Sequence, residues 1–139
     1  MITARAVSFV LATIALWDAA GLVLGGRAAV NTPSWAVLGT FPGPEAMGAL
    51  YLATGVLLLW ALRHPGELMA WVLSGGMALY AMVTISFLAS WWVVGGGVVW
   101  TAPSKTAGLA VLWLLTLLAR PMPVPVSYTH LTLPTILRV

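Results

Sequence analysis

Long uncharged stretches of apolar residues divide the first 120 positions of the chain. The first stretch lies between Arg5 and Arg27 and contains a single charge, Asp18, while the second, from Ala46 to Leu62, contains none. An α-helix needs about 20 mostly apolar residues to cross a bilayer. These two stretches therefore predict membrane-spanning helices at about residues 6–24 and 46–62.

A third uncharged stretch, from Leu68 to Ser104, has 37 residues and is too long for one span. Three consecutive glycines, Gly95 to Gly97, divide it, because glycine is unfavourable inside a helix. We expect a third span at about residues 68–93, an irregular connection, and a fourth span at about residues 103–119. Lys105 would then lie near the start of the fourth helix and extend its amine to the membrane surface.

Four such segments predict an all-α fold, a polytopic transmembrane four-helix bundle that forms a single domain over residues 1–125. Helices in lipid associate through close packing at small side chains and through interhelical hydrogen bonds. Pairs of small residues four positions apart place such side chains on one face of a helix. The candidate helix-packing residues are Gly21, Gly25, Ser74 and Ala78.

The connection between the first two spans contains two turn clusters, Asn31-Thr32-Pro33-Ser34 and Phe41-Pro42-Gly43-Pro44. Serine commonly caps the start of a helix. The cluster therefore allows Ser34 to cap a single helical turn that lies in the membrane interface. An apolar loop that rests on the bundle is an equally good interpretation.

The amino-acid composition excludes several classes of protein. Only 6% of the 139 residues are charged and 61% are hydrophobic, which excludes a soluble globular domain and a disordered chain. The net charge of +3 comes from scattered residues, and this argues against nucleic acid as a partner. The sequence has no cysteine, no cluster with metal-ligand spacing and no catalytic or phosphate-binding motif. We therefore expect no enzymatic activity, no metal and no cofactor.

Asp18 is the one charged side chain that lies away from the ends of the predicted spans. A carboxylate at the bilayer centre costs about 2.5–3.5 kcal/mol on insertion scales, so it needs a polar partner. The candidate intramembrane polar site comprises Asp18, Thr54, Tyr80 and Thr84, with Ser86 and Arg27 as further partners. Two interpretations stay open: a site for a proton or cation, or a buried acceptor that only joins neighbouring helices.

The end of the sequence changes character abruptly to a threonine-rich string. Residues 126–135, Val-Ser-Tyr-Thr-His-Leu-Thr-Leu-Pro-Thr, resemble one reading frame of a transposon-end adapter used in DNA sequencing. We therefore expect residues 126–139 to be a non-native tail that plays no part in the fold. Four spans are then the minimum for the native protein.

The region from Arg5 to Arg120 resembles the small four-helix, holin-like membrane proteins of actinobacterial phages and their hosts. The resemblance lies in Trp17-Asp18 in the first span, in Pro33-Ser34-Trp35 in the connection and in the glycine-bearing second span. It implies a protein that oligomerises and permeabilises the inner membrane. The alternatives are a transporter or ion-coupled protein that uses Asp18, and a membrane scaffold or accessory subunit without activity of its own.

Basic residues in short loops predict the orientation of the spans. Arg5, Arg63 and Arg120 fall on one side of the predicted membrane, and Arg27 and Lys105 fall on the other. Because basic loops stay on the cytoplasmic side, both termini are predicted to be cytoplasmic. We thus expect a multi-pass protein of the inner (cytoplasmic) membrane, with the lipid bilayer and further copies of the chain as partners.

Overall fold

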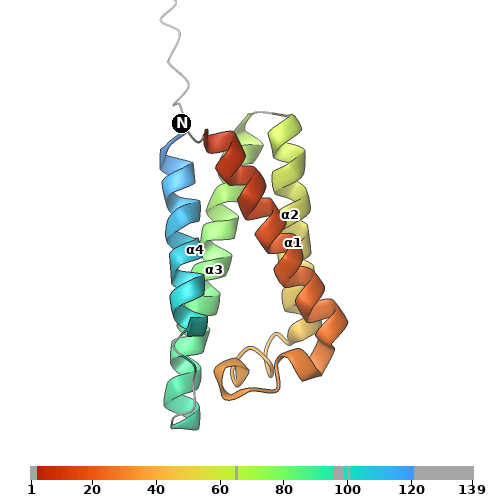
Figure 1. Ribbon diagram of the computed structural model, residues 1–139, viewed down its shortest axis with the longest axis vertical. Coiled ribbons are helices and arrows are strands. Elements are labelled where there is room, and N and C mark those ends of the chain that lie inside the picture. The colour runs from red at the N-terminus through yellow and green to blue at the C-terminus, as the bar shows by residue number, and fades with distance from the viewer. Residues whose placement is uncertain (1–2, 65, 96–98, 100, 121–139) are drawn as a thin grey trace, which may run out of the picture.

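The computed structural model describes residues 3–64, 66–95, 99 and 101–120, and these form four long helices (Figure 1). Helix α1 spans Ala4–Ala29, α2 spans Pro44–Arg63, α3 spans Glu67–Val94 and α4 spans Thr101–Leu118. Each helix is long and apolar enough to cross a membrane. The predicted all-α fold with four candidate spans is confirmed, and the chain is accordingly treated as a multi-pass membrane protein.

The second, third and fourth helices begin and end within two residues of the predicted spans, but α1 is longer at both ends. The Thr3 side chain accepts a hydrogen bond from the Ala6 N–H at 3.3 Å and caps the helix start. At the other end, α1 continues to Ala29 through Gly26, whose φ of 49° bends the helix. Only glycine adopts such a φ without strain. The predicted tail, residues 126–139, lies outside the described residues.

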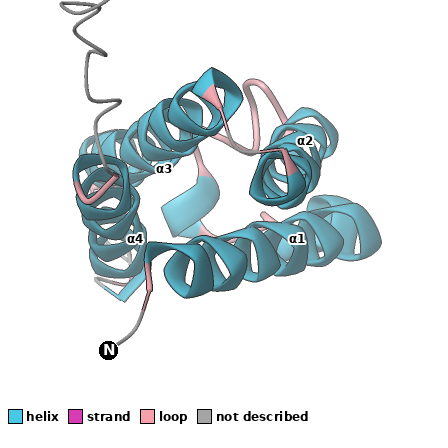
Figure 2. Cartoon of the chain, turned by 90° about the horizontal axis from the view of Figure 1, so that it is seen from above, coloured by secondary structure: helices cyan, strands magenta, loops and turns pink. Residues whose placement is uncertain are grey.

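The four helices pack as two antiparallel pairs, α1 with α2 and α3 with α4. The pairs are close together at the end where α2 is followed by α3. They diverge toward the opposite end, where α1 leans away from α4 (Figure 1). Seen from above, the helices surround a central region, and the connection between α1 and α2 crosses below it (Figure 2). This divergence makes room for an internal cavity near the connection.

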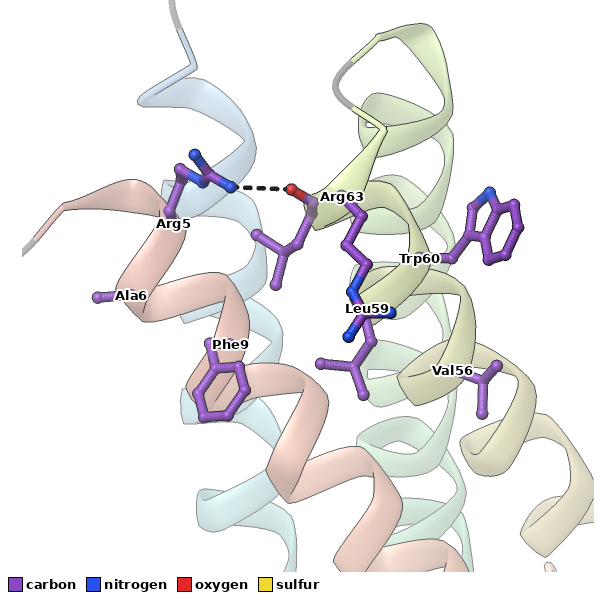
Figure 3. A pocket seen from close by; sticks show the side chains of 8 residues that line it. Arg5, Ala6, Phe9, Val56, Leu59, Trp60 and Arg63 are labelled. Carbon is purple, nitrogen blue, oxygen red and sulfur yellow. Dashed lines mark hydrogen bonds between the residues drawn. The ribbon is translucent and has the colours of Figure 1, made fainter.

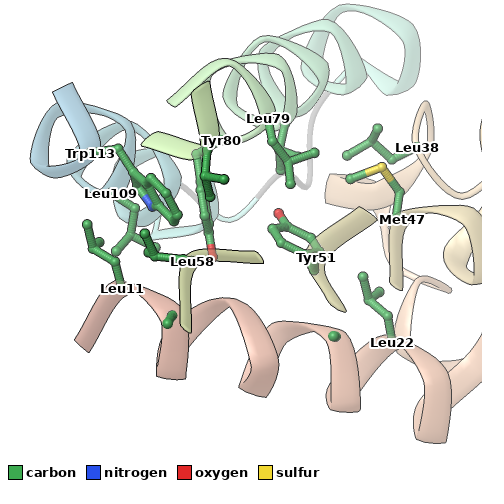
Figure 4. Packing of buried hydrophobic residues seen from close by; sticks show 14 of the residues in the cluster. Leu11, Leu22, Leu38, Met47, Tyr51, Leu58, Leu79, Tyr80, Leu109 and Trp113 are labelled. Carbon is green, nitrogen blue, oxygen red and sulfur yellow. The ribbon is translucent and has the colours of Figure 1, made fainter. Parts of the chain in front are cut away.

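Large side chains from all four helices fill the space between the pairs (Figure 4). Tyr80 of α3 lies at the centre: its ring is tilted against Tyr51, with centroids 5.2 Å apart, and stacks on Trp113, with centroids 6.1 Å apart. Leu11 and Leu58 pack beside them and are fully buried. The core is therefore aromatic at its centre and aliphatic around it.

Glycines let the helices of each pair approach closely. A Cβ on Gly55 would lie 2.7 Å from Leu16 of α1, and a Cβ on Gly48 would lie 3.0 Å from Val23. In the other pair, Gly76 of α3 lies directly against the ring of Trp113. The contacts of α1 with α2 and of α3 with α4 thus depend on positions without a side chain, as expected for helices in lipid.

Two buried serines hold the connection between α1 and α2 against α3 and against the segment that follows α3. The connection contains a short 3-10 helix, η1, at Pro33–Trp35. Ser34 lies inside η1 and accepts a hydrogen bond from the Val99 N–H at 3.1 Å, so its predicted role as a helix cap is wrong. Ser90 of α3 accepts from the Val37 N–H at 3.2 Å. The connection thus contains the single helical turn of the first interpretation, with Thr32 and not Ser34 at its cap position, and it rests on the bundle as in the second.

The outer surface of the bundle is apolar. Only 22–39% of the positions in each span are buried within the chain, so most of its apolar side chains face outward. Exposed tryptophans lie near the ends of α2 and α3, namely Trp60, Trp71, Trp91 and Trp92. Tryptophan favours the boundary between lipid and water. This surface indicates that the helices sit in a lipid bilayer.

Candidate functional site

Asp18 of α1 is held by two donors from the other helix pair. The Tyr80 hydroxyl of α3 donates to Oδ2 at 2.9 Å, and the Lys105 ammonium of α4 donates to Oδ1 at 3.2 Å. The Asp18 side chain is 18% exposed, whereas that of Lys105 is 59% exposed. One carboxylate oxygen is therefore committed to a buried neutral donor and the other to a charged donor that reaches the surface.

Asp18 lies inside the straight part of α1. That part ends at the bend at Gly26, eight residues beyond Asp18, or about 12 Å at 1.5 Å per residue. A carboxylate at such a depth is costly unless it is paired. Arg27, the basic residue expected nearby, lies in the last turn of α1, and it is Lys105 that pairs with Asp18.

Asp18 and Lys105 line two adjacent spaces, a cavity among the helices and a groove on the outside of the bundle. The cavity, of about 160 Å³, is partly open; all four helices and η1 contribute to it, and Trp35, Val83 and Phe87 are among its apolar walls. The groove, of about 550 Å³, runs between α1 and α4 on the outside of the bundle. Both charged residues line both spaces. The ion pair thus lies where the two spaces adjoin, between α1 and α4.

Further hydroxyl groups face the same interior. Tyr51 is 2% exposed and lines the cavity, and its hydroxyl has no hydrogen-bond partner among the residues that the structure describes. Thr106 also lines the cavity, and its hydroxyl lies 2.8 Å from that of Thr84. The cavity therefore combines a carboxylate, an ammonium group and hydroxyls with aromatic walls, and a proton or a small polar ligand could be bound there.

The residues predicted for the intramembrane polar site do not all contact Asp18. Tyr80 bonds Asp18 directly. Thr84 bonds the Tyr80 carbonyl and Thr106, one turn of α3 away from the carboxylate. Thr54 and Ser86 donate to carbonyls of their own helices, Leu50 and Met82, at 2.8 and 2.9 Å. Only Tyr80 of these hydroxyls reaches Asp18.

The predicted helix-packing residues lie largely outside the interfaces of the single chain. Gly21 and Gly25 are on an exposed face of α1, and a Cβ on Gly21 would meet nothing within 4 Å. Ser74 is half-buried and Ala78 is exposed on α3. Gly48 and Gly55, which do contact α1, are seven residues apart. Spacing by seven also returns to the same helix face, and that signal could have identified them.

Basic residues gather at the end of the bundle where α2 is followed by α3. Arg5 donates to the Leu62 carbonyl at 3.0 Å, and Arg120 donates to the Gly66 carbonyl at 2.9 Å. His64 follows α2 directly and stacks on Trp60, with ring centroids 4.6 Å apart. The described residues contain no group of three or more His, Cys, Asp or Glu side chains placed to hold a metal ion.

Lys105 is the site residue that the sequence did not predict as such. Its place near the start of a short helix favours an amine directed at the membrane surface. In a four-helix bundle the last helix can close against the first, however, and that neighbour relation brings Lys105 to Asp18. Tyr51 was also not predicted as a site residue, because an uncharged tyrosine in an apolar helix gives no distinct signal in the sequence.

The chain matches none of the known protein-family models, curated proteins or solved structures with which it was compared. The resemblance to holin-like proteins therefore has no support from these comparisons. Function is inferred from the residues of the site alone.

Proposed function

We propose that the chain is a multi-pass membrane protein that moves protons, with Asp18 as the group that carries them. The observation behind this proposal is the position of Asp18 where the cavity and the outer groove adjoin, with its two oxygens held by Tyr80 and Lys105. Ionisable residues inside membrane spans commonly mark ion or proton pathways.

The proposed chemistry is an exchange of cations on one oxygen. A proton that arrives on Oδ1 of Asp18 replaces the ammonium of Lys105, while the Tyr80 hydroxyl still donates to Oδ2. Lys105 has a flexible stem and is mostly exposed, so its ammonium is free to move to the membrane surface. Loss of that proton restores the ion pair.

This exchange also changes the contact between the helix pairs. The ion pair joins α1 to α4, whose mutual packing is slight compared with that inside each pair. When the pair opens, the two charges where the groove and the cavity adjoin are no longer bonded to each other. Access to Asp18 would then alternate with its protonation.

Proton flux in reconstituted vesicles tests the proposal. We expect vesicles that contain the protein to dissipate an imposed pH gradient faster than empty vesicles, and Asp18→Asn to reduce this rate to that of empty vesicles. Asparagine keeps an oxygen for the Tyr80 hydroxyl but cannot release a proton at neutral pH. An internal pH-sensitive dye measures the rate.

The matched control is Glu45→Gln, which removes a carboxylate from the exposed first turn of α2. This variant should retain the full flux. If Asp18→Asn protein is correctly folded and still dissipates the gradient at the original rate, Asp18 does not carry the proton.

A holin-like function, in which copies of the chain assemble and permeabilise the membrane, is the second candidate. The exposed face of α1 favours it, because Gly21 and Gly25 lie there with no helix of the same chain packed against them. Small residues of this kind allow close approach of a helix from another copy.

The variant Gly21→Leu tests whether copies of the chain assemble through this face, without disturbing the fold of the monomer. A Cβ there meets nothing within the chain, so Gly21→Leu should leave the monomer folded but weaken any oligomer and prevent loss of membrane potential after induced expression. Gly75→Leu, at an equally open position on α3, is the control. Cells that keep their membrane potential and growth when the unaltered protein is expressed would exclude the holin-like function.

A further inference from the structure

A groove between α1 and α2 opens at the end of the bundle where α2 is followed by α3. It has a volume of about 620 Å³, within the range of about 300–1,000 Å³ that is usual for ligand sites. Arg5 and Phe9 line it from α1, and Val56, Leu59 and Arg63 line it from α2 (Figure 3). It is separate from the Asp18 cavity, with which it shares no lining residue.

The charges in this groove are all positive. Among the residues that the structure describes, Arg5 and Arg63 are the only charged ones that line it. Arg5 uses one N–H group on the Leu62 carbonyl, and the Arg63 side chain makes no hydrogen bond to any residue that the structure describes. Figure 3 shows the Arg63 side chain extending back along α2 beside Leu59. The groove therefore offers guanidinium donors to an anion.

The rest of the groove is apolar and open. Phe9 and Val56 are 58% and 51% exposed, one on each helix, and they line the end of the groove nearest the middle of the span. Trp60, at the same end of α2, is exposed and has the residue type that favours the membrane boundary. One groove thus combines arginines close to the ends of the spans, where lipid headgroups would lie, with apolar side chains farther inside the spans, where acyl chains would lie.

We propose that this groove binds an anionic phospholipid. The phosphate lies between the guanidinium groups of Arg5 and Arg63, and an acyl chain follows Phe9 and Val56 into the membrane. Arginine is suited to phosphate because its planar fork donates two parallel hydrogen bonds. Basic pockets between membrane helices commonly hold anionic headgroups. An anion without an acyl chain would use the guanidinium groups but leave the apolar part of the groove unoccupied.

Native mass spectrometry of the full chain in detergent tests this site. Phosphatidylglycerol and phosphatidylethanolamine of the same acyl chains are added separately. We expect one phosphatidylglycerol molecule to bind with an affinity about tenfold higher than that of phosphatidylethanolamine, a difference equivalent to about 1.4 kcal/mol. Arg63→Gln should abolish this preference.

Two further variants distinguish the groove from general surface charge. Val56→Trp fills the apolar part of the groove without removing a charge, and it should reduce lipid binding while both arginines remain. Arg120→Gln removes a cation from the same end of the bundle but outside the groove, and it should leave lipid binding unchanged.

Three results would contradict specific binding of an anionic phospholipid in this groove. Equal binding of the two lipids, or an equal loss in Arg120→Gln and Arg63→Gln, would overturn the proposal in favour of non-specific attraction. Displacement of the lipid by millimolar inorganic phosphate, together with unchanged binding to Val56→Trp, would show that only a phosphate group is recognised. The proton-flux assay on Asp18 variants is independent of all these results.

Discussion

Valine in place of Gly76 is expected to destabilise the bundle by about 3 kcal/mol, at the upper end of the usual cost of overpacking a core. A Cβ at this position would overlap the six-membered ring of Trp113, which is fully buried between α3, α4 and the central tyrosine. The indole stacks on Tyr80, so we expect a shift of the indole to disturb the packing of the central tyrosine. Unfolding of the purified protein in mixed micelles titrated with sodium dodecyl sulfate measures the loss.

The neighbouring glycine supplies the control. Gly75 is exposed and a Cβ there meets nothing within 4 Å, so Gly75→Val should keep the original stability. The indole N–H of Trp113 has no partner among the described residues, so shape rather than hydrogen bonding fixes this side chain. A smaller residue, as in Trp113→Leu, should therefore restore part of the stability lost in Gly76→Val. Equal effects of valine at both glycines would contradict this account.

Methionine in place of Lys105 is expected to destabilise the bundle by about 2 kcal/mol. Removal of one partner from a fully buried ion pair costs about 3–5 kcal/mol, because the other charge is left uncompensated. The cost here should be lower since Lys105 is 59% exposed, and water and lipid headgroups partly screen the pair. Methionine retains the apolar stem, so the change reports on the charge.

A double-mutant cycle isolates the interaction of Lys105 with Asp18. Once Asp18→Asn has removed the carboxylate, Lys105→Met should have little further effect, and the double variant should be more stable than Lys105→Met alone. Arg27→Met is the matched control, because Arg27 is an exposed cation near the opposite end of α1 from Arg5. If the two substitutions at 18 and 105 are additive, the ion pair contributes nothing to the fold.

The helices could be predicted from the sequence because their signal is local. Charges such as Arg5, Glu45 and Arg63 bracket runs whose length matches a bilayer, and the same runs form the helices. The exact end of α1 could not be predicted. Continuation to Ala29 depends on Gly26 adopting a positive φ, and glycine is equally compatible with the end of a helix.

The site was only partly predictable because it depends on which helices are neighbours. The cost of an unpaired carboxylate in a span indicates that Asp18 needs a donor, and Tyr80 was among the candidates. The sequence contains no information on which hydroxyl faces α1, so Thr54 was an equally good candidate although it bonds its own helix. Lys105 required the further knowledge that α4 lies beside α1.

The pattern of small residues along the chain also did not predict which helices pack together. Glycine and alanine are abundant, and spacing by four selects Gly21 and Gly25 as readily as any interface. The contacts that form, at Gly55 and Gly76, depend on what lies opposite: Leu16 in one case and the Trp113 ring in the other. Such complementarity is a property of two helices, whereas periodicity describes only one.

The unequal lengths of α3 and α4 have a consequence for the surrounding lipid. With 28 and 18 residues, the two helices are about 42 and 27 Å long at 1.5 Å per residue, although they are packed side by side. The hydrocarbon layer is about 30 Å thick, so α4 is shorter than the layer and α3 exceeds it. We expect the bilayer to thin slightly beside α4, and the last turn of α3, with Trp91 and Trp92, to lie in the headgroup layer. Hydrophobic mismatch of this kind would favour thinner membranes for the protein and would deform the lipid unevenly around its circumference.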